Sequence, residues 1–531
     1  MLTLFAYNFK LCAMKKILYI LLLLLIAPAY SQPLTSKEID NVVERTMKAF
    51  NVPGIAVAVV RDGSVIHMKG YGVSSIATSR KMDENTLFAI ASNSKAFTSA
   101  ALGILIDEDK LTWDTKVIDI IPEFRLYNPY VTSDFNIKDL LTHRSGMGLG
   151  AGDLMMWPGE PSFTREDIIH NLRYLKQTSP FRTKYDYDNL LYIVAGVVVE
   201  KVSGMSWEEF VEARIMRPLG MDNSAASINR LKDKSNVIDA HVPVDGVLQV
   251  VPKHQSDVHN PAGGIFSSVA DMSKWVIMQM NDGLYGEKLD KRIFSEKVHR
   301  EMWTPQTIIP VSSAGPYRSH FASYGLGWRL TDVCGYLQAS HTGGLMGIVT
   351  QVTLIPEMKL GIIVFTNQQQ GAAFTAITNE IKDGYLGVKD IDWISLLRES
   401  VDRSQEEAKN VIDEIWARVD RQRATAEQPY SNSIFTGTYT DEWFGDIVIT
   451  DAGDHLRFTA IKSPDLTGDM LYYTGNTYIV KWDDRTLDAD AFMEFTLDRE
   501  GIPSMITMEA ISPLTDFSFD FHDLTLVRRA E

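Results

Sequence analysis

The first hydrophobic pattern along the chain predicts a helix followed by a pair of strands. Apolar residues recur at helical spacing over residues 35–50, and a Pro-Gly pair at 53–54 then interrupts the pattern. Residues 55–60 are continuously apolar, as in a buried strand, and residues 61–64 form a hairpin-type turn before a second strand at 65–68. The apolar positions of the helix are Ile39, Val42, Val43, Met47 and Phe50. A helix beside a hairpin indicates a domain of mixed helices and strands.

Helices dominate the middle of the chain, and strands return after residue 320. Capping boxes, in which a Ser or Thr is followed three residues later by an acid, mark three helix starts. Strands follow at residues 324–329 and 347–366. The capping boxes are Thr164–Asp167, Ser206–Glu209 and Ser268–Asp271. This order predicts an α+β domain, an α/β sandwich with one sheet built from both ends of the domain and a helical insertion between them.

The pattern of apolar and charged positions changes after residue 388. Residues 389–432 place apolar positions on one face and charges around them, which predicts an amphipathic connector made of one helix or a helix pair. From residue 433 to 531, short strands alternate with Gly, Asp and Pro turns, a pattern typical of a small antiparallel barrel or a sandwich. We therefore predict a main domain over residues 32–388, the connector, and a small β-rich domain.

The N-terminal residues 1–31 have the pattern of a signal peptide. Two lysines precede an apolar run over residues 17–27, and small residues follow up to Ser31. The run is too short to span a bilayer readily, although a retained membrane anchor is the alternative. Cleavage after Ser31 predicts an exported protein, periplasmic or extracellular, with no stable membrane insertion. Met14, directly before the lysines, is an alternative start of the chain.

Composition narrows the classes of partner. Of the 531 residues, 45% are hydrophobic and 23% are charged, as in ordinary globular proteins. The net charge is −16, or −19 after loss of the three lysines of the leader, and no basic cluster is present, so we expect no nucleic-acid partner. Cys12 lies in the leader, so Cys334 has no partner for an intrachain disulfide. A homo-oligomer is compatible with these features.

Residues 88–95 carry the first candidate for chemistry, a serine and a lysine three residues apart at the start of an apolar helix. Residues at i and i+3 share one face of a helix, so Ser92 Oγ and the Lys95 amine would point into the same space. A serine hydroxyl needs a base to become a nucleophile, and a desolvated lysine with a lowered pKa can be that base. The alternative is a helix cap followed by a surface lysine.

Two further motifs could complete an acyl-transfer site. Tyr187 and Asn189 form Tyr-x-Asn before an apolar helix, where a tyrosine can take and return a proton; the alternative is a packed tyrosine and a capping Asn. A His-Thr-Gly-Gly segment at 341–344 offers a cationic or hydrogen-bonding side chain, a hydroxyl and close backbone approach; the alternative is a tight strand bend. Tyr185 competes for the tyrosine role, but the Tyr-x-Asn spacing favours Tyr187.

Taken together, the three motifs resemble the signatures of the penicillin-recognising serine hydrolases. The likeness is greatest to the branch that holds class C β-lactamases, D,D-carboxypeptidases, D-aminopeptidases and related esterases, and it covers residues 35–385. Flanking segments at 136–146, 217–221 and 260–264 carry it as well. The resemblance implies the β-lactamase/transpeptidase-like fold, an antiparallel sheet flanked by helices with an all-helical subdomain.

The resemblance also implies a role for each motif residue. Ser92 would attack a carbonyl and form an acyl-enzyme, while Lys95 and Tyr187 would share the proton transfers, with either of them as the base. Asn189 would bind the substrate amide. The backbone N–H groups of Ser92 and Gly344 would form the oxyanion hole.

The His-Thr-Gly segment is where this chain departs from most β-lactamases of the branch. By the resemblance, His341, Thr342 and Gly343 would face the carboxylate or an equivalent polar end of the substrate. Most β-lactamases of this type carry a lysine where this chain has His341, and a histidine is only partly charged near neutral pH. The His-x-Gly form resembles the peptidases and esterases of the branch, which argues against an efficient β-lactamase.

The tail resembles a small β-rich, lipocalin-like domain of unknown function that follows many hydrolases of this branch, and it could bind a ligand, cover the cleft or mediate assembly. We predict an exported serine hydrolase that cleaves an amide or ester through an acyl-Ser92 intermediate, first of all in D-residue-containing peptides of the cell-wall type. A small-ester esterase or weak β-lactamase, and a non-catalytic sensor or scaffold, are the alternatives. The sequence holds no metal-ligand motif, so we expect no metal and no cofactor.

Overall fold

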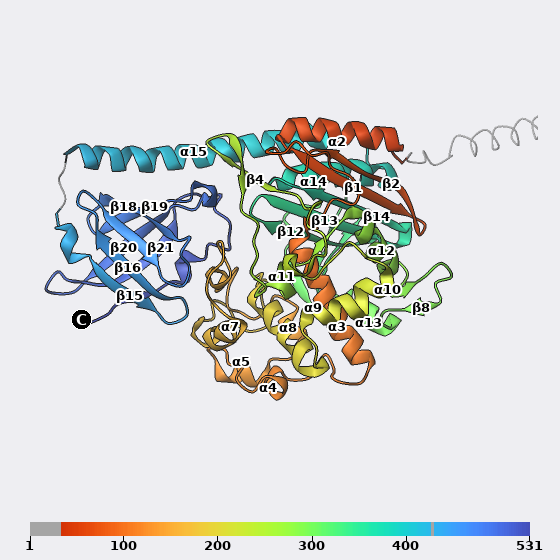
Figure 1. The fold of residues 1–531 in the computed structure, drawn as a ribbon, viewed down its shortest axis with the longest axis horizontal. Helices are drawn as coiled ribbons and strands as arrows, with labels where there is room; N and C mark the ends of the chain where they lie inside the picture. The colour runs from red at the N-terminus through yellow and green to blue at the C-terminus, as the bar shows by residue number, and fades with distance from the viewer. Residues whose placement is uncertain (1–32, 426–428, 531) are drawn as a thin grey trace, which may run out of the picture.

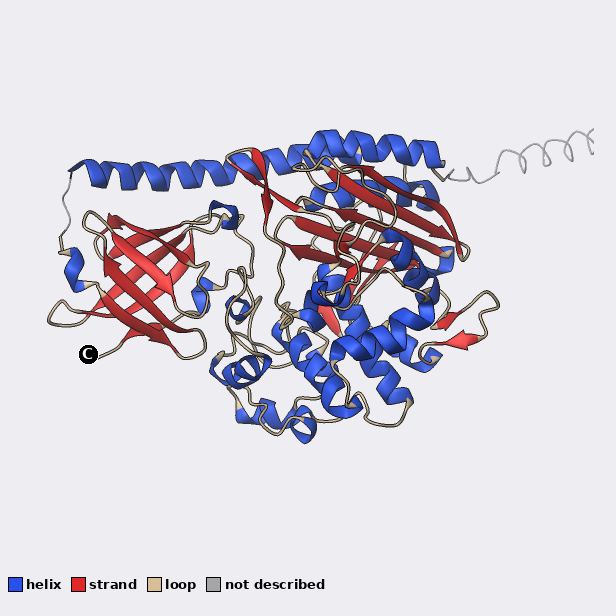
Figure 2. Ribbon diagram, in the orientation of Figure 1, coloured by secondary structure: helices blue, strands red, loops and turns tan. Residues whose placement is uncertain are grey.

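The computed structural model describes residues 33–425 and 429–530, so the predicted signal peptide and residues 426–428 lie outside the described residues. Two bodies are joined along one side by a long helix, α15 (Trp393–Thr425), as Figure 1 shows. The larger body combines a sheet with helices, and the smaller one is a barrel of strands (Figure 2). The connector is one continuous helix rather than a pair.

The larger body is built on an eight-stranded antiparallel sheet in the order β2-β1-β14-β13-β12-β11-β10-β9. Strands β1 (Gly54–Arg61) and β14 (Leu360–Thr366) pair with each other although they come from opposite ends of the domain. This pairing confirms the prediction of one sheet built from both ends of an α+β domain. The other strands are β2 (Ser64–Gly72), β9 (Thr307–Ile309), β10 (Ala322–Tyr324), β11 (Arg329–Val333), β12 (Tyr336–Leu345) and β13 (Ile348–Ile355).

Helices cover both faces of the sheet, which explains the unbroken apolar run of β1. Ile55, Val57 and Val59 point to one face and pack in the cluster that contains the apolar residues of α2 and α14. Ala56 and Ala58 point to the other face, with α3 and α12. These helices are α2 (Ser36–Phe50), α3 (Ser94–Asp107), α12 (Val269–Gln279) and α14 (Gly371–Leu386).

The helical insertion is packed around α8 (Leu190–Ser203), in which every residue from Leu190 to Val199 is buried. Helices α3 and α8 contact each other, which brings the motifs at their N-terminal ends close together. The shorter helices are α4 (Val117–Ile120), α5 (Pro129–Asp134), α6 (Ile137–Leu140), α7 (Arg165–Asn171), α9 (Trp207–Val211), α10 (Arg217–Leu219), α11 (Asn260–Gly263) and α13 (Glu296–Met302). Small strand pairs are β3 (Phe88–Ala89) with β6 (Phe266–Ser267), β4 (Ala240–Val244) with β5 (Val247–Val251), and β7 (Leu284–Tyr285) with β8 (Lys291–Arg292).

Two of the three predicted capping boxes form in full, at Thr164 and at Ser206. At Ser268 the hydroxyl accepts from the Asp271 backbone N–H, but the Asp271 carboxylate is engaged elsewhere and accepts from Asn223 N and Ser224 Oγ. The third helix start is therefore capped on one side only. Within residues 33–425 and 429–530, no single helix is long and apolar enough to cross a membrane; α8 and the following segment Trp207–Leu219, bent by 75°, meet the length and composition test only as a pair.

The smaller body is a closed antiparallel barrel of eight strands, so the tail is a barrel and not a sandwich. Its interior is filled by buried aromatic side chains, among them Tyr439, Phe458, Tyr478, Trp482 and Phe495. The strands are β15 (Gly437–Asp441), β16 (Gly445–Asp451), β17 (Leu456–Ala460), β18 (Thr467–Thr474), β19 (Thr477–Trp482), β20 (Ala491–Leu497), β21 (Pro503–Ala510) and β22 (Leu526–Arg528).

The connecting helix holds the two bodies side by side. Near its start, Trp393 and Ile394 are buried in the cluster that contains α2 and α14 of the larger body. Near its end, Ile415 and Val419 pack against Ile479 on the outside of the barrel. The amphipathic pattern of the connector therefore serves two successive contacts, one with each body.

Candidate active site

Ser92 lies at the N-terminal end of α3, where the chain makes a sharp turn. Residues Ala91–Asn93 form a 3₁₀ turn, η1, and Ala91 has a φ of 49°, in the left-handed region that non-glycine residues rarely adopt. The turn lies against β12, where a Cβ added to Gly343 would stand 2.3 Å from the carbonyl oxygen of Ile90. Glycine is required at 343 because the two backbones approach so closely, and this approach places Ser92 beside the His-Thr-Gly strand.

Lys95 lies one turn further along, fully buried, with its amine directed back at Ser92. Its Nζ donates to Ser92 Oγ at 3.1 Å, to Asn189 Oδ1 at 2.7 Å and to the Ala262 carbonyl at 2.9 Å. Burial lowers the pKa of Lys95 to about 7, and the charges of Asp153 and Asp188 oppose this change. A substantial fraction of Lys95 is therefore a neutral amine near neutral pH.

The three partners of Lys95 differ in what they can do when it loses a proton. The Asn189 Oδ1 and Ala262 carbonyl oxygens can only accept, so they keep the two remaining N–H groups. The Ser92 hydroxyl can donate, so the amine lone pair is left directed at the Ser92 proton. The geometry prepares Lys95 to act as a base on Ser92.

Tyr187 lies beside the lysine, with its ring centre 4.8 Å from Lys95 Nζ. Its hydroxyl is buried and makes no hydrogen bond of good geometry within the described residues. Burial raises the pKa of Tyr187 well above its usual value, and interaction with the Ser92 hydroxyl opposes that rise. The phenol is thus protonated at neutral pH and suited to give a proton, not to take one. Tyr185, the competing tyrosine, lines the same cavity, and burial raises its pKa to about 12.

His341 is turned inward and has both ring nitrogens occupied. Nδ1 lies 2.6 Å from the carbonyl oxygen of Thr342, which can only accept, so Nδ1 carries the proton. Nε2 then accepts from the Tyr324 hydroxyl at 2.8 Å. Burial, with the nearby Lys95 charge, lowers the pKa of His341 to about 3. The ring is neutral, which corrects the expectation of a partly charged histidine.

Asn189 joins the lysine to a buried acid that the sequence motifs did not include. Its Oδ1 accepts from Lys95, and its Nδ2 donates to Asp153 Oδ2 at 2.8 Å. Asp153 is fully buried, and burial raises its pKa to about 8. Burial likewise raises the pKa of the neighbouring Asp188 to about 7. Both polar atoms of Asn189 are engaged by protein groups, although the residue lines the cavity where a substrate amide would lie.

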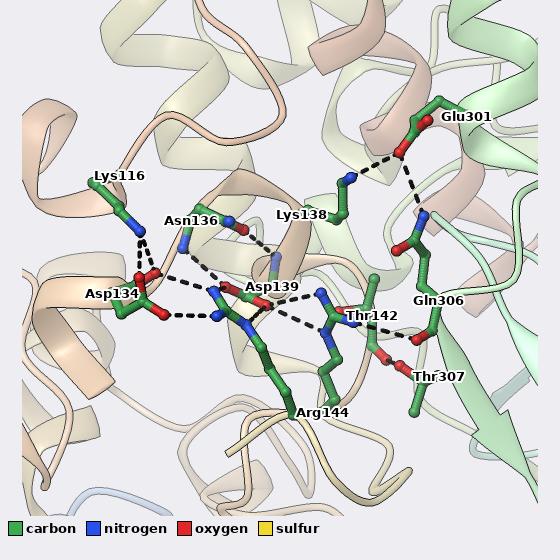
Figure 3. A network of polar contacts seen from close by, with 11 residues as sticks. Lys116, Asp134, Asn136, Lys138, Asp139, Thr142, Arg144, Glu301, Gln306 and Thr307 are labelled. Carbon is green, nitrogen blue, oxygen red and sulfur yellow. Dashed lines mark hydrogen bonds and ion pairs between the residues drawn. The ribbon is translucent and has the colours of Figure 1, made fainter. Parts of the chain in front are cut away.

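A polar network fixes the 136–146 segment, which leads into the site (Figure 3). The buried Asp139 carboxylate accepts from Arg144 and from Arg182. One residue before Arg144, the His143 ring packs 4.2 Å from the ring of Tyr187. The network therefore holds in place the segment against which Tyr187 packs.

The motif residues surround one cavity of about 490 Å³. Ser92, Tyr187, Asn189, His341, Thr342 and Gly344 all line it. A Cβ added to Gly344 would meet no atom within 4 Å, so this part of β12 faces open space. Within the described residues, no group of three or more His, Cys, Asp or Glu side chains could hold a metal ion.

The cavity also contains residues that the motifs did not predict. Arg329, on the strand next to β12, supplies a guanidinium group, and it is paired in register with Ser340. Met156 and Trp157 supply apolar surface. Asp516, Phe517 and Ser518 reach the cavity from the barrel.

A serine beside a buried lysine and a tyrosine, on this fold, is the arrangement typical of the serine hydrolases of the β-lactamase/transpeptidase type. The sequence profile described as "Beta-lactamase" matches residues 39–384, and the chain belongs to this family. A second profile, "Domain of unknown function (DUF3471)", matches residues 421–528, which include the barrel.

Relatives agree with this assignment. The chain is 28% identical to "Unguisins hydrolase ungD" of Aspergillus violaceofuscus over 78% of this chain and 77% of that protein. It is 24% identical to "Protein flp" of Staphylococcus aureus, over 63% of each chain. The structure of the octameric penicillin-binding protein homologue from Pyrococcus abyssi is similar with a TM-score of 0.59 and 20% identity, covering 93% of this chain and 99% of that chain. This last likeness concerns the fold alone.

Proposed function

We propose that the protein is an exported hydrolase that cleaves an amide bond through an acyl-Ser92 intermediate, in peptides that contain D-residues and end in a free carboxylate. The observation that carries the acyl-enzyme is the set of Lys95 contacts, in which Ser92 is the partner able to donate a proton to the amine. Export follows from the leader-like pattern of residues 1–31.

The reaction follows from the positions of these groups. Lys95 takes the Ser92 proton as Oγ bonds to the substrate carbonyl carbon, and the oxyanion is held by the backbone N–H groups of Ser92 and Gly344. The C–N bond then breaks, and the leaving amine takes a proton from Tyr187, which Lys95 reprotonates. Lys95 then takes a proton from the water that attacks the resulting ester and returns it to Ser92 Oγ as the ester bond breaks, which releases the acid and restores Ser92.

The rate of Ser92 acylation should rise with pH through about 7, because Lys95 acts as a base only when it is neutral. Below that pH the amine is an ammonium group, and the rate should fall about tenfold per pH unit. Single-turnover kinetics from about pH 5 to pH 9 check this rise of the rate near pH 7, the limb of the pH–rate profile that reports on Lys95. A rate that is flat across this range, or that falls as the pH rises through 7, would exclude Lys95 as the base.

The carboxylate preference rests on Arg329. Since His341 is neutral, the positive charge that faces the cavity from this side of the sheet comes from the Arg329 guanidinium. Arg329 is opposite Ser340 in the register of β11 and β12, two positions along the strand from Thr342, which also lines the cavity. A guanidinium and a hydroxyl on adjacent strands suit a carboxylate acceptor.

Arg329→Ala should raise KM about tenfold for a peptide with a free C-terminal carboxylate, because a charged hydrogen bond is lost, and should leave kcat within about twofold. The same peptide with an amidated C-terminus should show no such difference. Arg329→Lys should restore part of the affinity, since it keeps the charge but not the fork of donors. An equal effect on the free and the amidated peptide would remove Arg329 from carboxylate binding.

A substrate panel tests the proposed function as a whole. It compares peptides that end in D-Ala-D-Ala with their L-Ala counterparts, D-amino-acid amides, p-nitrophenyl esters and nitrocefin. We expect the highest kcat/KM on a D-residue peptide. Ester turnover with no peptide turnover would make the protein an esterase, and rapid nitrocefin turnover would overturn the interpretation of His341.

A further inference from the structure

One loop of the C-terminal barrel extends into the active-site cavity of the hydrolase domain. This barrel loop, residues 511–520, follows β21 and leads toward β22. Its Asp516, Phe517 and Ser518 line the cavity that contains Ser92. The Phe517 ring lies edge-on to the Tyr187 ring, with 5.9 Å between their centres.

The end of the barrel loop is fastened to the hydrolase domain by a buried carboxylate. Asp520 accepts hydrogen bonds from the backbone N–H of Gly152 at 2.6 Å and of Leu154 at 3.1 Å. A Cβ added to Gly150 would stand 2.7 Å from the Phe517 carbonyl oxygen, so the glycine-rich 148–152 segment accommodates the loop. A carboxylate that is fully buried between two domains and hydrogen-bonded there indicates a specific, stable contact between the domains.

From the barrel loop, a chain of hydrogen bonds leads to Lys95. Ser518 Oγ donates to Asp153 Oδ2 at 2.8 Å. The same oxygen accepts from Asn189 Nδ2 at 2.8 Å, and Asn189 Oδ1 accepts from Lys95 Nζ at 2.7 Å. The bond to Asp153 decides which way the Asn189 amide points, and only this orientation presents an oxygen to Lys95.

We propose that the barrel loop is a working part of the active site, in which Ser518 is a positioning residue that orients Lys95 through Asp153 and Asn189. The proposal rests on the proposed function, because it concerns how the base of that reaction is held. It assigns the C-terminal domain a role in catalysis within one chain, whereas a mere contact between domains would affect stability alone.

The two ends of this chain of hydrogen bonds, Ser518 and Lys95, are also coupled electrostatically. Asp153 is faced by Lys95 from α3, by Asp188 from the start of α8 and by Asp520 from the barrel loop. The hydrogen bond from Ser518 lowers the pKa of Asp153, and the Asp153 charge raises the pKa of Lys95. Loss of the Ser518 hydroxyl therefore favours neutral Asp153 and lowers the pKa of Lys95.

The test measures phosphonylation of Ser92 by a fluorophosphonate in full-length protein as a function of pH. Ser92 Oγ bonds to phosphorus, fluoride leaves, and Lys95 takes the proton, so the rate reports on Lys95 without any peptide substrate. Ser518→Ala should move the limb near pH 7 toward lower pH by about half a unit or more and lower the plateau rate about fivefold. Ser518→Thr, which keeps a hydroxyl, should restore both values.

Two further variants keep the test decisive. Thr515→Ala removes a hydroxyl of the same loop that is directed at the Asp488 carbonyl of the barrel, and it should behave like the wild type. Asp153→Asn should shift the limb in the same direction as Ser518→Ala even if the serine variant folds poorly. The melting temperature of each variant is recorded alongside.

The outcomes separate the two proposals. Suppose that the probe labels the wild type. If Ser518→Ala then keeps the pH limb and the plateau rate of the wild type, or differs from it in melting temperature alone, the positioning role of Ser518 is overturned. A wild type that the probe does not label at Ser92 at any pH would overturn the proposed function itself, and the positioning role with it.

Discussion

Ser92→Ala should lower kcat/KM by at least about 10⁴-fold, because Ser92 carries the hydroxyl that contacts the Lys95 amine and would form the acyl-enzyme. Ser92 Oγ is the group 3.1 Å from Lys95 Nζ and on the cavity wall. The side chain is only partly buried, and its removal costs one hydrogen bond, so the free energy of unfolding should change by about 1 kcal/mol or less. Steady-state kinetics and denaturant unfolding of the same preparation check both numbers.

Ser94→Ala is the matched control for this variant. Ser94 lies two residues along the same turn, but its Oγ accepts from the Ile265 backbone N–H and does not line the cavity. Its loss leaves a buried N–H without a partner, which should cost about 1–3 kcal/mol of stability while kcat/KM is kept. Activity of Ser92→Ala within about tenfold of wild type, or loss of activity in a folded Ser94→Ala, would show that Ser92 is not the nucleophile.

Lys95→Met should lower kcat about 10³-fold and abolish the pH limb near 7. Methionine fills a similar volume, yet it supplies neither a base for Ser92 nor donors for Asn189 Oδ1 and the Ala262 carbonyl. Lys274→Met, which removes a partly exposed lysine bound to Asp271, is the control and should leave kcat unchanged.

Stability against pH gives a second readout of Lys95. The folded pKa of about 7 lies below the unfolded value near 10.5, so between these values the unfolded chain binds one more proton. The wild type should therefore gain stability relative to Lys95→Met as the pH rises from about 7 to 10, and lose that gain as the pH falls through 7. An unchanged limb in Lys95→Met, or a stability difference that does not vary with pH, would contradict a buried lysine base.

Some features of the site could be predicted because the information is local. Ser92 and Lys95 are three residues apart, and helical spacing alone brings their side chains to one face. The Tyr-x-Asn and His-Thr-Gly motifs are short enough to recognise, and the structure brings both motifs to the Ser92 cavity. The main sheet followed from strands at the two ends of a domain with helices between them.

Other features depend on contacts between distant residues. Ser518 and Asp153 are 365 positions apart, and no local pattern in the sequence shows that their side chains meet. The sequence alone does not distinguish Arg329 from the other arginines, because its place beside β12 follows only from the pairing of β11 with β12. The neutral state of His341 comes from its burial and from the Tyr324 hydroxyl, and neither is visible in a His-Thr-Gly segment.

The barrel illustrates the same limit. Short strands with regular turns indicated a sandwich or a barrel, because alternation of buried and exposed residues is the same in both. Closure is decided by the pairing of β15 with β22, the first and last strands of the domain. The contact of the barrel loop with Tyr187 then depends on how α15 sets the barrel beside the hydrolase domain.

The central claim is that Ser92 becomes acylated with Lys95 as its base. Peptide mapping by mass spectrometry, after the full-length protein is incubated with a fluorophosphonate or a β-lactam, tests it most directly. We expect one covalent adduct on the peptide that contains Ser92, absent in Ser92→Ala, with a rate that rises through pH 7. No adduct on this peptide under conditions that label a related serine hydrolase, or an adduct that persists in Ser92→Ala, would contradict the account.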